Sequence, residues 1–142
     1  MRKRSVAREC ALKVLYQIEV GGRPAIQALK DFWEQEADHP AEVQEFTTRI
    51  VEGVSSRRDD LDQGISKYAT NWQVKRMAVI DRNVLRMGLF ELKFSSDIPP
   101  KVAINEAVDL AKKYGDMDSG KFVNGILDRV LREEVGVPPP SA

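Results

Sequence analysis

Basic residues crowd the start of the chain, where the first helix is expected to begin. Arg2, Lys3, Arg4 and Arg8 occur there, with no acidic residue among the first eight. The free N–H groups of a helix start carry about half a positive charge, so each cation there costs roughly 0.3–1 kcal/mol. Tyr16 shares a ridge with Arg4 and Arg8 at i, i+4 spacing. Cations beside an aromatic ring fit phosphates and a splayed base, which predicts an RNA contact; a solvated arm is the alternative.

A second group with possible chemistry lies at the start of DMDSGKFVNGILD. A helix is expected to begin near Ser119, with Asp118 or Ser119 as its cap. Its free N–H groups, with Lys121 beside them, form a natural seat for a phosphate. Phe122 either stacks on a base or joins the core, and periodicity slightly favours the core. Gly125, with Asn124 in mid-helix, predicts a close helix–helix approach, because glycine there costs about 1 kcal/mol against alanine.

Two polar residues interrupt the otherwise apolar or small-residue segment KVAINEAVDLAKKYG. Asn105 and Glu106 could be functional, but we favour a buried polar pair that satisfies neighbouring backbone groups.

Residues for catalysis, metal binding or a cofactor do not converge in the sequence. His39, the single histidine, lies in a turn and is expected to face solvent. Cys10 lies on an apolar stripe, where a small hydrophobic residue is the better interpretation. No glycine-rich loop has the spacing of a phosphate cradle. We therefore predict no enzyme, no catalytic or metal-binding residues and no cofactor.

Length and composition predict one ordinary globular domain. The chain has 142 residues, of which 42% are hydrophobic. A single cysteine gives no internal disulfide, and no stretch approaches the roughly 18 apolar residues of a membrane span. We expect a cytoplasmic protein with no membrane partner.

The formal net charge of zero hides an uneven distribution. Residues 31–62 contain ten acidic and three basic residues, which gives −7 there and leaves +7 for the remainder. Net charge alone would therefore miss a nucleic-acid-binding surface.

Helical periodicity extends over most of the chain, and no segment alternates like a long strand. The first helix, expected over residues 5–20, is apolar on most of its circumference, as is typical of a helix packed on two sides. Further helices are expected at about 24–37, 41–69, 71–80 and 100–115. The second of these has a possible bend near Gly53, and Asn71 is the expected cap of the third. Two more helices are expected to begin at a cap, one at Asp81 and one at residue 118 or 119. The sequence thus predicts an all-α fold of about seven helices.

Four motifs together resemble the NusB family of transcription antitermination factors. They are RxxARECALxxLYQ, DRNVLRMGLFEL, KVAINEAVDLAKKYG and KFVNGILD, and the resemblance extends from about Arg4 to Arg132. It implies a single domain over residues 1–142 built from two small helical bundles that share the first helix. The expected subdomains are about 1–70 and about 71–134, with a frayed tail at 135–142.

The resemblance also implies a function and its partners. NusB-like proteins pair with the small-subunit ribosomal protein NusE, and together they bind boxA RNA in the transcription elongation complex and support ribosomal RNA synthesis. By motif position, the protein-partner contact falls on Asp81 and Arg82. The RNA-binding residues of the family fall on Arg2, Lys3, Arg4, Arg8, Tyr16, Asp118, Lys121 and Phe122.

Two alternatives stay open from the sequence. A related helical domain occurs fused to RNA cytosine methyltransferases, and a stand-alone relative of that domain is less favoured because no catalytic domain follows within the 142 residues. The other alternative is a helical protein-interaction scaffold that binds no RNA.

Overall fold

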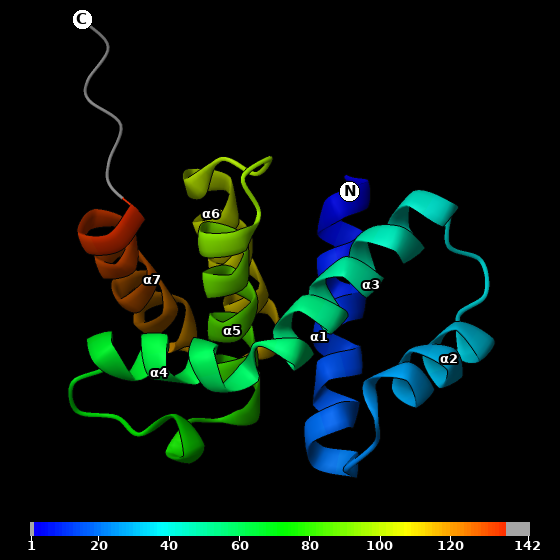
Figure 1. Cartoon of the computed structure of the whole chain (residues 1–142), viewed down its shortest axis with the longest axis horizontal. Coiled ribbons are helices and arrows are strands. Elements are labelled where there is room, and N and C mark those ends of the chain that lie inside the picture. The colour runs from blue at the N-terminus through cyan, green and yellow to red at the C-terminus, as the bar shows by residue number, and fades with distance from the viewer. Residues whose placement is uncertain (1, 136–142) are drawn as a thin grey trace, which may run out of the picture. The chain divides into compact units, whose positions relative to one another are not determined.

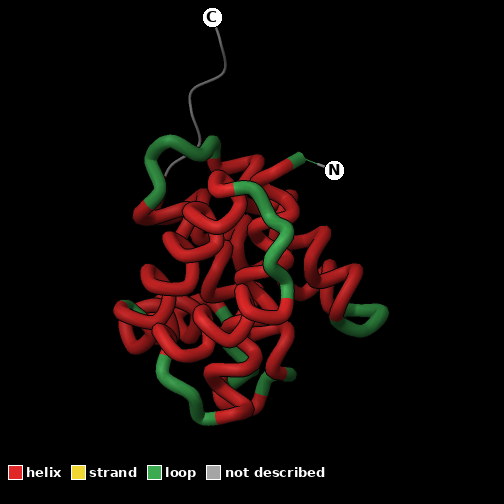
Figure 2. Tube along the Cα trace, turned by 90° about the vertical axis from the view of Figure 1, so that its right-hand side faces the viewer, coloured by secondary structure: helices red, strands yellow, loops and turns green. Residues whose placement is uncertain are grey.

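A computed structural model describes residues 2–135, which form helices joined by short loops (Figures 1 and 2). The all-α prediction is confirmed: residues 2–135 contain seven α-helices, a short 3₁₀ turn, a π-helical turn and no strand. The elements are α1 Lys3–Gly21, α2 Ala25–Gln35, α3 Ala41–Ser56, α4 Arg58–Tyr68, the 3₁₀ turn Val74–Arg76, α5 Val79–Phe94, α6 Pro100–Tyr114, α7 Ser119–Val130 and the π-helical turn Leu131–Val135.

Two compact units make up the chain, and they divide between Arg58 and Asp59. This boundary falls earlier than the expected subdomain boundary near residue 70. The first unit contains α1, α2 and α3, and the second contains nearly all of α4 and everything after it. No helix among residues 2–135 is long and apolar enough to cross a membrane. Most of the expected frayed tail, residues 136–142, lies outside the described residues.

Helix α1 packs against both α2 and α3 in the first unit, as its wide apolar stripe predicts. It ends where Gly22 adopts φ +67°, a left-handed conformation that glycine takes without strain. The hydroxyl of Thr47 on α3 lies 3.2 Å from the carbonyl of Ala7 on α1, which links the two helices, and 2.7 Å from the carbonyl of Val43 in its own helix. The sharing of α1 with a second bundle stays a prediction.

The expected third helix over 41–69 is interrupted. Helix α3 ends at Ser56, and Arg57 leaves the helical conformation with φ −117° and ψ 18° before α4 begins. The hydroxyl of Ser56 donates a hydrogen bond to the carbonyl of Gly53 at 3.3 Å. Serine hydroxyls that bond the preceding turn compete with the helix ladder, which explains why the predicted bend is a break.

Helix α5 packs against α6 and α7 in the second unit. Gly88 permits the closest approach, because a Cβ atom there would lie 2.6 Å from Cδ1 of Leu127 on α7 and 3.3 Å from Cβ of Ala107 on α6. The close approach expected at Gly125 was wrong: apart from its chain neighbours and its own helix backbone, no heavy atom of the described residues lies within 4 Å of a Cβ built at that position. Glycine content alone could not distinguish the two positions.

The start of α5 also differs from the expectation. Asp81 is not the cap; Ala78 precedes the helix, and Asp81 lies in its first turn, where a negative charge is favourable. Similarly, Gln73 and not Asn71 precedes the short 3₁₀ turn. A partly buried ion pair joins α4 to α5: the guanidinium of the buried Arg86 donates to both carboxylate oxygens of the half-buried Asp62, at 2.7 and 3.0 Å.

Candidate nucleic-acid interface

The first turn of α1 contains no acidic residue and begins from Arg2 in an extended conformation. Arg2, Lys3 and Arg4 are exposed, as a phosphate-binding arm requires. Lys3 also pairs with Glu42 on α3 at 3.3 Å. Both side chains are mostly exposed, and such surface pairs contribute little energy, so the ammonium group can exchange Glu42 for another anion at small cost.

Three guanidinium groups surround one aromatic ring at the α1–α3 contact of the first unit. The Cζ atoms of Arg4, Arg8 and Arg49 lie 4.6, 5.2 and 5.4 Å from the ring centroid of Phe46. We call these four residues the Phe46 cluster. Sequence reasoning missed Phe46 as a support and Arg49 as a member, because Arg49 lies in the acidic segment 31–62. Their i, i+3 spacing on one helix was the available signal.

The cluster borders a depression of about 310 Å³ lined by Lys3, Arg4, Phe46, Arg49 and two glutamates of α3. Within the cluster Arg8 differs from Arg4, because Arg8 is only 2% exposed whereas Arg4 is exposed. Tyr16, two turns further along the predicted ridge, is 38% exposed. Arg4 and Tyr16 of the predicted ridge are therefore exposed at the surface, whereas Arg8 is buried against Phe46.

Helix α7 begins at Ser119, as the sequence predicts, with Asp118 directly before it. The hydroxyl of Ser119 accepts from the backbone N–H of Asp116 at 3.0 Å and lies 3.2 Å from its carboxylate. Ser119 thus closes the turn and is buried, whereas Asp118 and Lys121 are exposed. The exposed charges at this helix start are the ones available to a ligand.

Phe122 is half-buried, between the two roles that the sequence allows. Its ring contacts Trp72 edge to face, with centroids 5.9 Å apart and an interplanar angle of 75°. Trp72 is 57% exposed. Sequence reasoning placed Trp72 in a short helix and gave it no role, since the loop that brings it to α7 has no periodicity.

The polar pair of α6 does not form the buried pair that we favoured. Asn105 is exposed and Glu106 is half-buried. The inward positions of this helix are taken by its small and branched apolar residues, and Asn105 falls on the opposite side. Neither residue can be assigned to the core, and Asn105 is available at the surface.

Asp81 and Arg82, the residues predicted to contact a protein partner, have different surroundings. One carboxylate oxygen of Asp81, Oδ1, is buried and has no hydrogen-bond partner among the described residues. Arg82 donates to the carbonyls of Met77 at 2.8 Å and Lys75 at 3.2 Å, which holds the 3₁₀ turn against the start of α5. Asp81 is half-buried and reaches solvent only with the rest of its side chain, and Arg82 has a structural role in addition to any contact.

The structure brings together two reactive residue types that are distant in the sequence. Sγ of Cys10 lies 4.0 Å from Nε2 of His39, whose ring also contacts Trp33 at 5.7 Å between centroids. The expectation of a solvent-facing histidine was wrong, because His39 is half-buried. Burial and the charge of Glu36 raise the pKa of the Cys10 thiol to about 11. The thiol stays protonated at neutral pH, so it is not an activated nucleophile.

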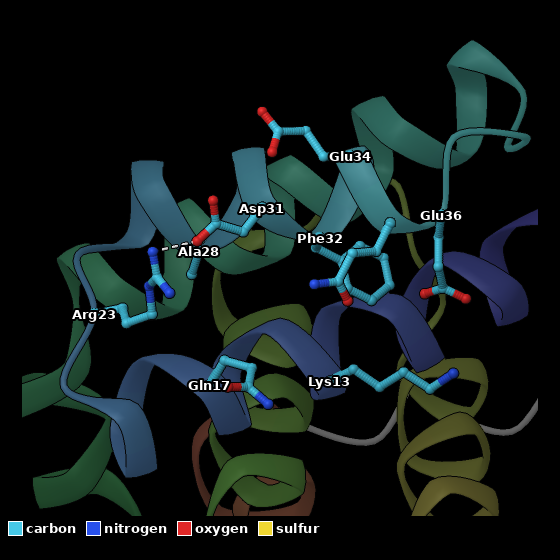
Figure 3. A pocket seen from close by; sticks show the side chains of 9 residues that line it. Lys13, Gln17, Arg23, Ala28, Asp31, Phe32, Glu34 and Glu36 are labelled. Carbon is cyan, nitrogen blue, oxygen red and sulfur yellow. Dashed lines mark ion pairs between the residues drawn. The ribbon is translucent and has the colours of Figure 1, made fainter.

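A larger depression of about 730 Å³ lies between α1 and α2 in the first unit (Figure 3). Lys13 and Gln17 of α1 face Asp31 and Phe32 of α2 across it, and Arg23 forms an ion pair with Asp31 at one end. Its lining mixes both charges and contains no cysteine, serine or histidine. No group of three or more potential metal ligands occurs among residues 2–135.

Comparisons with known proteins show which family this chain belongs to. The model of the NusB family matches residues 5–132. The chain belongs to the NusB family. The matched residues include the Phe46 ring and the Trp72–Phe122 pair and begin directly after Arg4.

Individual relatives agree with the family match. The chain is 47% identical over 133 residues to the transcription antitermination protein NusB of Myxococcus xanthus, covering 92% of this chain and 95% of that protein. Among solved structures it resembles T. maritima NusB, with a TM-score of 0.84 and 36% identity over 94% of this chain and 92% of that one.

A further solved structure contains the antitermination factors NusB and NusE in complex with double-stranded RNA. The chain resembles it with a TM-score of 0.83 and 32% identity, covering 92% of this chain and 96% of that one.

Proposed function

We propose that this NusB-family chain is a transcription antitermination factor that binds boxA RNA together with NusE in the transcription elongation complex and supports ribosomal RNA synthesis. The observation that carries the proposal is the resemblance over nearly the whole chain to the NusB–NusE–RNA complex, combined with a helix start that contains cations and no acids. Such a start favours an anionic ligand, which lowers the cost of the misplaced charges.

The proposed RNA surface has one part on each compact unit. On the first unit, Arg2, Lys3 and Arg4 would neutralise phosphates, Arg8 would hold its place against Phe46, and Tyr16 would stack on a base. On the second unit, Asp118, Lys121 and Phe122 supply the helix start and a ring. The exposure of Arg4, Tyr16 and Lys121 supports this assignment.

We propose that the protein works by binding and not by catalysis. The raised pKa of the Cys10 thiol supports this, because the Cys10–His39 pair lacks the thiolate that a nucleophilic mechanism needs. A binding protein of this kind acts in the compartment of transcription, so we also propose a cytoplasmic location.

The proposed NusE contact includes Asp81. Asp81 is half-buried in the first turn of α5, so the part of its side chain that solvent reaches would contact the partner protein. Asp81→Lys is expected to weaken NusE binding and to leave RNA binding by the isolated protein unchanged or slightly stronger, since the change adds positive charge. Pull-down of purified NusE, with RNA binding measured in parallel, checks both halves.

Titration of boxA-like RNA into the protein, with and without NusE, tests the proposal as a whole. A few phosphate contacts give weak affinity, around 10⁻⁴–10⁻⁶ M at physiological salt, so NusE should tighten RNA binding. Linkage requires RNA to tighten NusE binding by the same factor, and the corresponding coupling free energy is typically about 1–3 kcal/mol. Equal RNA affinities in both titrations would exclude the cooperative mechanism, and no RNA binding in either would favour the protein scaffold.

A further inference from the structure

Trp72 is the most exposed aromatic ring that also contacts a residue of the proposed RNA surface. It is 57% exposed, and its partner Phe122 is half-buried. An indole in this position normally gains free energy by burial, so an exposed one that is held in place suggests an interaction surface. The backbone N–H of Trp72 donates to the carbonyl of Ala69 at 3.0 Å, which fixes the turn that presents the ring.

Edge-to-face contact leaves room for a stacked ligand. In such a pair each ring has at least one face that its neighbour does not cover. The exposure of Trp72 places much of that remaining surface in contact with solvent. A base can therefore stack on the indole without separating Trp72 from Phe122.

Trp72 also lines a depression of about 700 Å³ in the second unit. Asp62, whose carboxylate is paired with Arg86, and Ser66 also line it. Its other polar lining residues are Thr70, Asn71, Gln73 and Lys75. All four of these polar residues are exposed. An aromatic face with amides and a cation beside it is the combination that recognises an unstacked nucleotide: stacking on the ring, hydrogen bonds to the base edge and a charge for the phosphate.

We propose that this depression, which we call the Trp72 pocket, binds one unstacked nucleotide of single-stranded RNA, with its base stacked on Trp72. The inference rests on the proposed RNA-binding function and extends the RNA surface beyond Phe122 onto the loop before α5. Lys75 contacts the phosphate, and Asn71 and Gln73 face the base edge. The Trp72–Phe122 contact links this pocket to the helix start at Lys121.

Tryptophan fluorescence can test the pocket directly, because the chain has only two tryptophans. Trp33→Phe, in the first unit, leaves Trp72 as the only indole. Titration of this single-tryptophan protein with a boxA-like RNA oligonucleotide should quench Trp72 emission, since a stacked base is a close quencher. Inorganic polyphosphate, which has the charge but no bases, should leave the emission unchanged.

Affinity measurements with matched variants give the second readout. Trp72→Leu keeps apolar bulk against Phe122 but removes the ring, and it should weaken RNA binding about 5- to 150-fold, the range for loss of one base–aromatic stack. Phe94→Leu is the control: Phe94 is 47% exposed and is likewise paired, with Phe90 at 6.1 Å, but it does not line the pocket. Its RNA affinity should equal that of the parent protein.

The outcomes separate this inference from the function on which it rests. RNA that binds, as seen by anisotropy of labelled RNA, without changing Trp72 emission would overturn the pocket and leave the RNA-binding proposal intact. No RNA binding by the parent protein, with or without NusE, would overturn both. A Trp72 response to NusE alone would assign the pocket to the protein partner and also overturn the inference. Should Trp72→Leu fail to fold, the emission of the single-tryptophan protein still decides.

Discussion

The Phe46 cluster and the Trp72–Phe122 pair use the same residue types in opposite ways. In the first unit the ring is inside: Phe46 is 6% exposed, and three guanidinium groups lie within 5.4 Å of its centroid. In the second unit the ring is outside: Trp72 is 57% exposed, and the nearby cation, Lys121, is also exposed. The first arrangement uses an aromatic ring to position charge, and the second uses one to offer a surface.

This difference decides what a substitution should cost. Removal of a buried ring leaves a cavity, so its main effect is on folding. Removal of an exposed ring leaves the fold nearly intact and removes a contact that exists only with a ligand. The comparison therefore predicts stability effects where the substituted side chain is buried and affinity effects where an exposed side chain contacts RNA.

Phe46→Ala should have the largest effect and should act on stability. A buried phenylalanine replaced by alanine typically costs 3–5 kcal/mol, and here the three guanidinium groups also lose their support. Chemical denaturation measures the loss. Phe46→Leu is the control, because it keeps most of the volume and isolates the part due to the ring. A loss below about 1 kcal/mol for alanine would contradict the buried-support role.

Phe122→Ala should instead act mainly on RNA. If its ring stacks on a base, the change loses about 1–3 kcal/mol of RNA affinity with little change in thermal midpoint. If Phe122 belongs to the core, the fold should lose roughly 3–5 kcal/mol. Half-burial in the structure favours the first outcome with a small stability loss. Normal RNA affinity in a strongly destabilised variant would move Phe122 to the core and break the comparison.

Arg4 and Arg8 provide a test within one cluster. Arg4 is exposed, so Arg4→Ala should make the slope of log affinity against log salt shallower by roughly 0.7, the value for one lost single-strand phosphate contact. Arg8 is 2% exposed, so Arg8→Ala should leave the slope nearly unchanged and cost about 2 kcal/mol of stability, as for a desolvated cation–π contact. Equal slope changes would show that burial does not separate their roles.

Much of the fold follows from periodicity, and the site follows only in part. The apolar stripe of α1 and the helix start at Ser119 were predictable because each depends on residues close in the sequence. The break at Arg57 follows Ser56, whose hydroxyl bonds the carbonyl of Gly53 and competes with the helix ladder, and hydrophobic periodicity does not register such a bond.

Contacts between segments that are distant in the sequence were the features that the sequence could not predict. Arg4 and Arg8 reach Phe46 only because α1 packs on α3, and Trp72 reaches Phe122 only through an aperiodic loop. The Cys10–His39 contact has the same origin. A single sequence gives the type of each residue and its local face, but long-range pairing depends on how the helices pack.

Gly125 provides the smallest and sharpest test of the open surface on α7. It follows Lys121 by one helical turn, so both lie on the same face. A Cβ atom at Gly125 would meet no heavy atom of another element within 4 Å. Gly125→Ala should therefore stabilise the protein by about 0.5–1 kcal/mol, because alanine is the better helix former and no clash offsets the gain.

Gly88→Ala is the matched control, since its Cβ atom would lie 2.6 Å from Cδ1 of Leu127 and should destabilise the second unit. Thermal and chemical denaturation of both variants give the signs. A destabilised Gly125→Ala would mean that this face is closed, which would also remove the open setting assigned to Lys121. If the variant is more stable but binds RNA or NusE less tightly, the ligand approaches the α7 backbone too closely for a methyl group. In that case glycine at this position would favour binding at a cost to folding stability, as we infer for the exposed indole of Trp72.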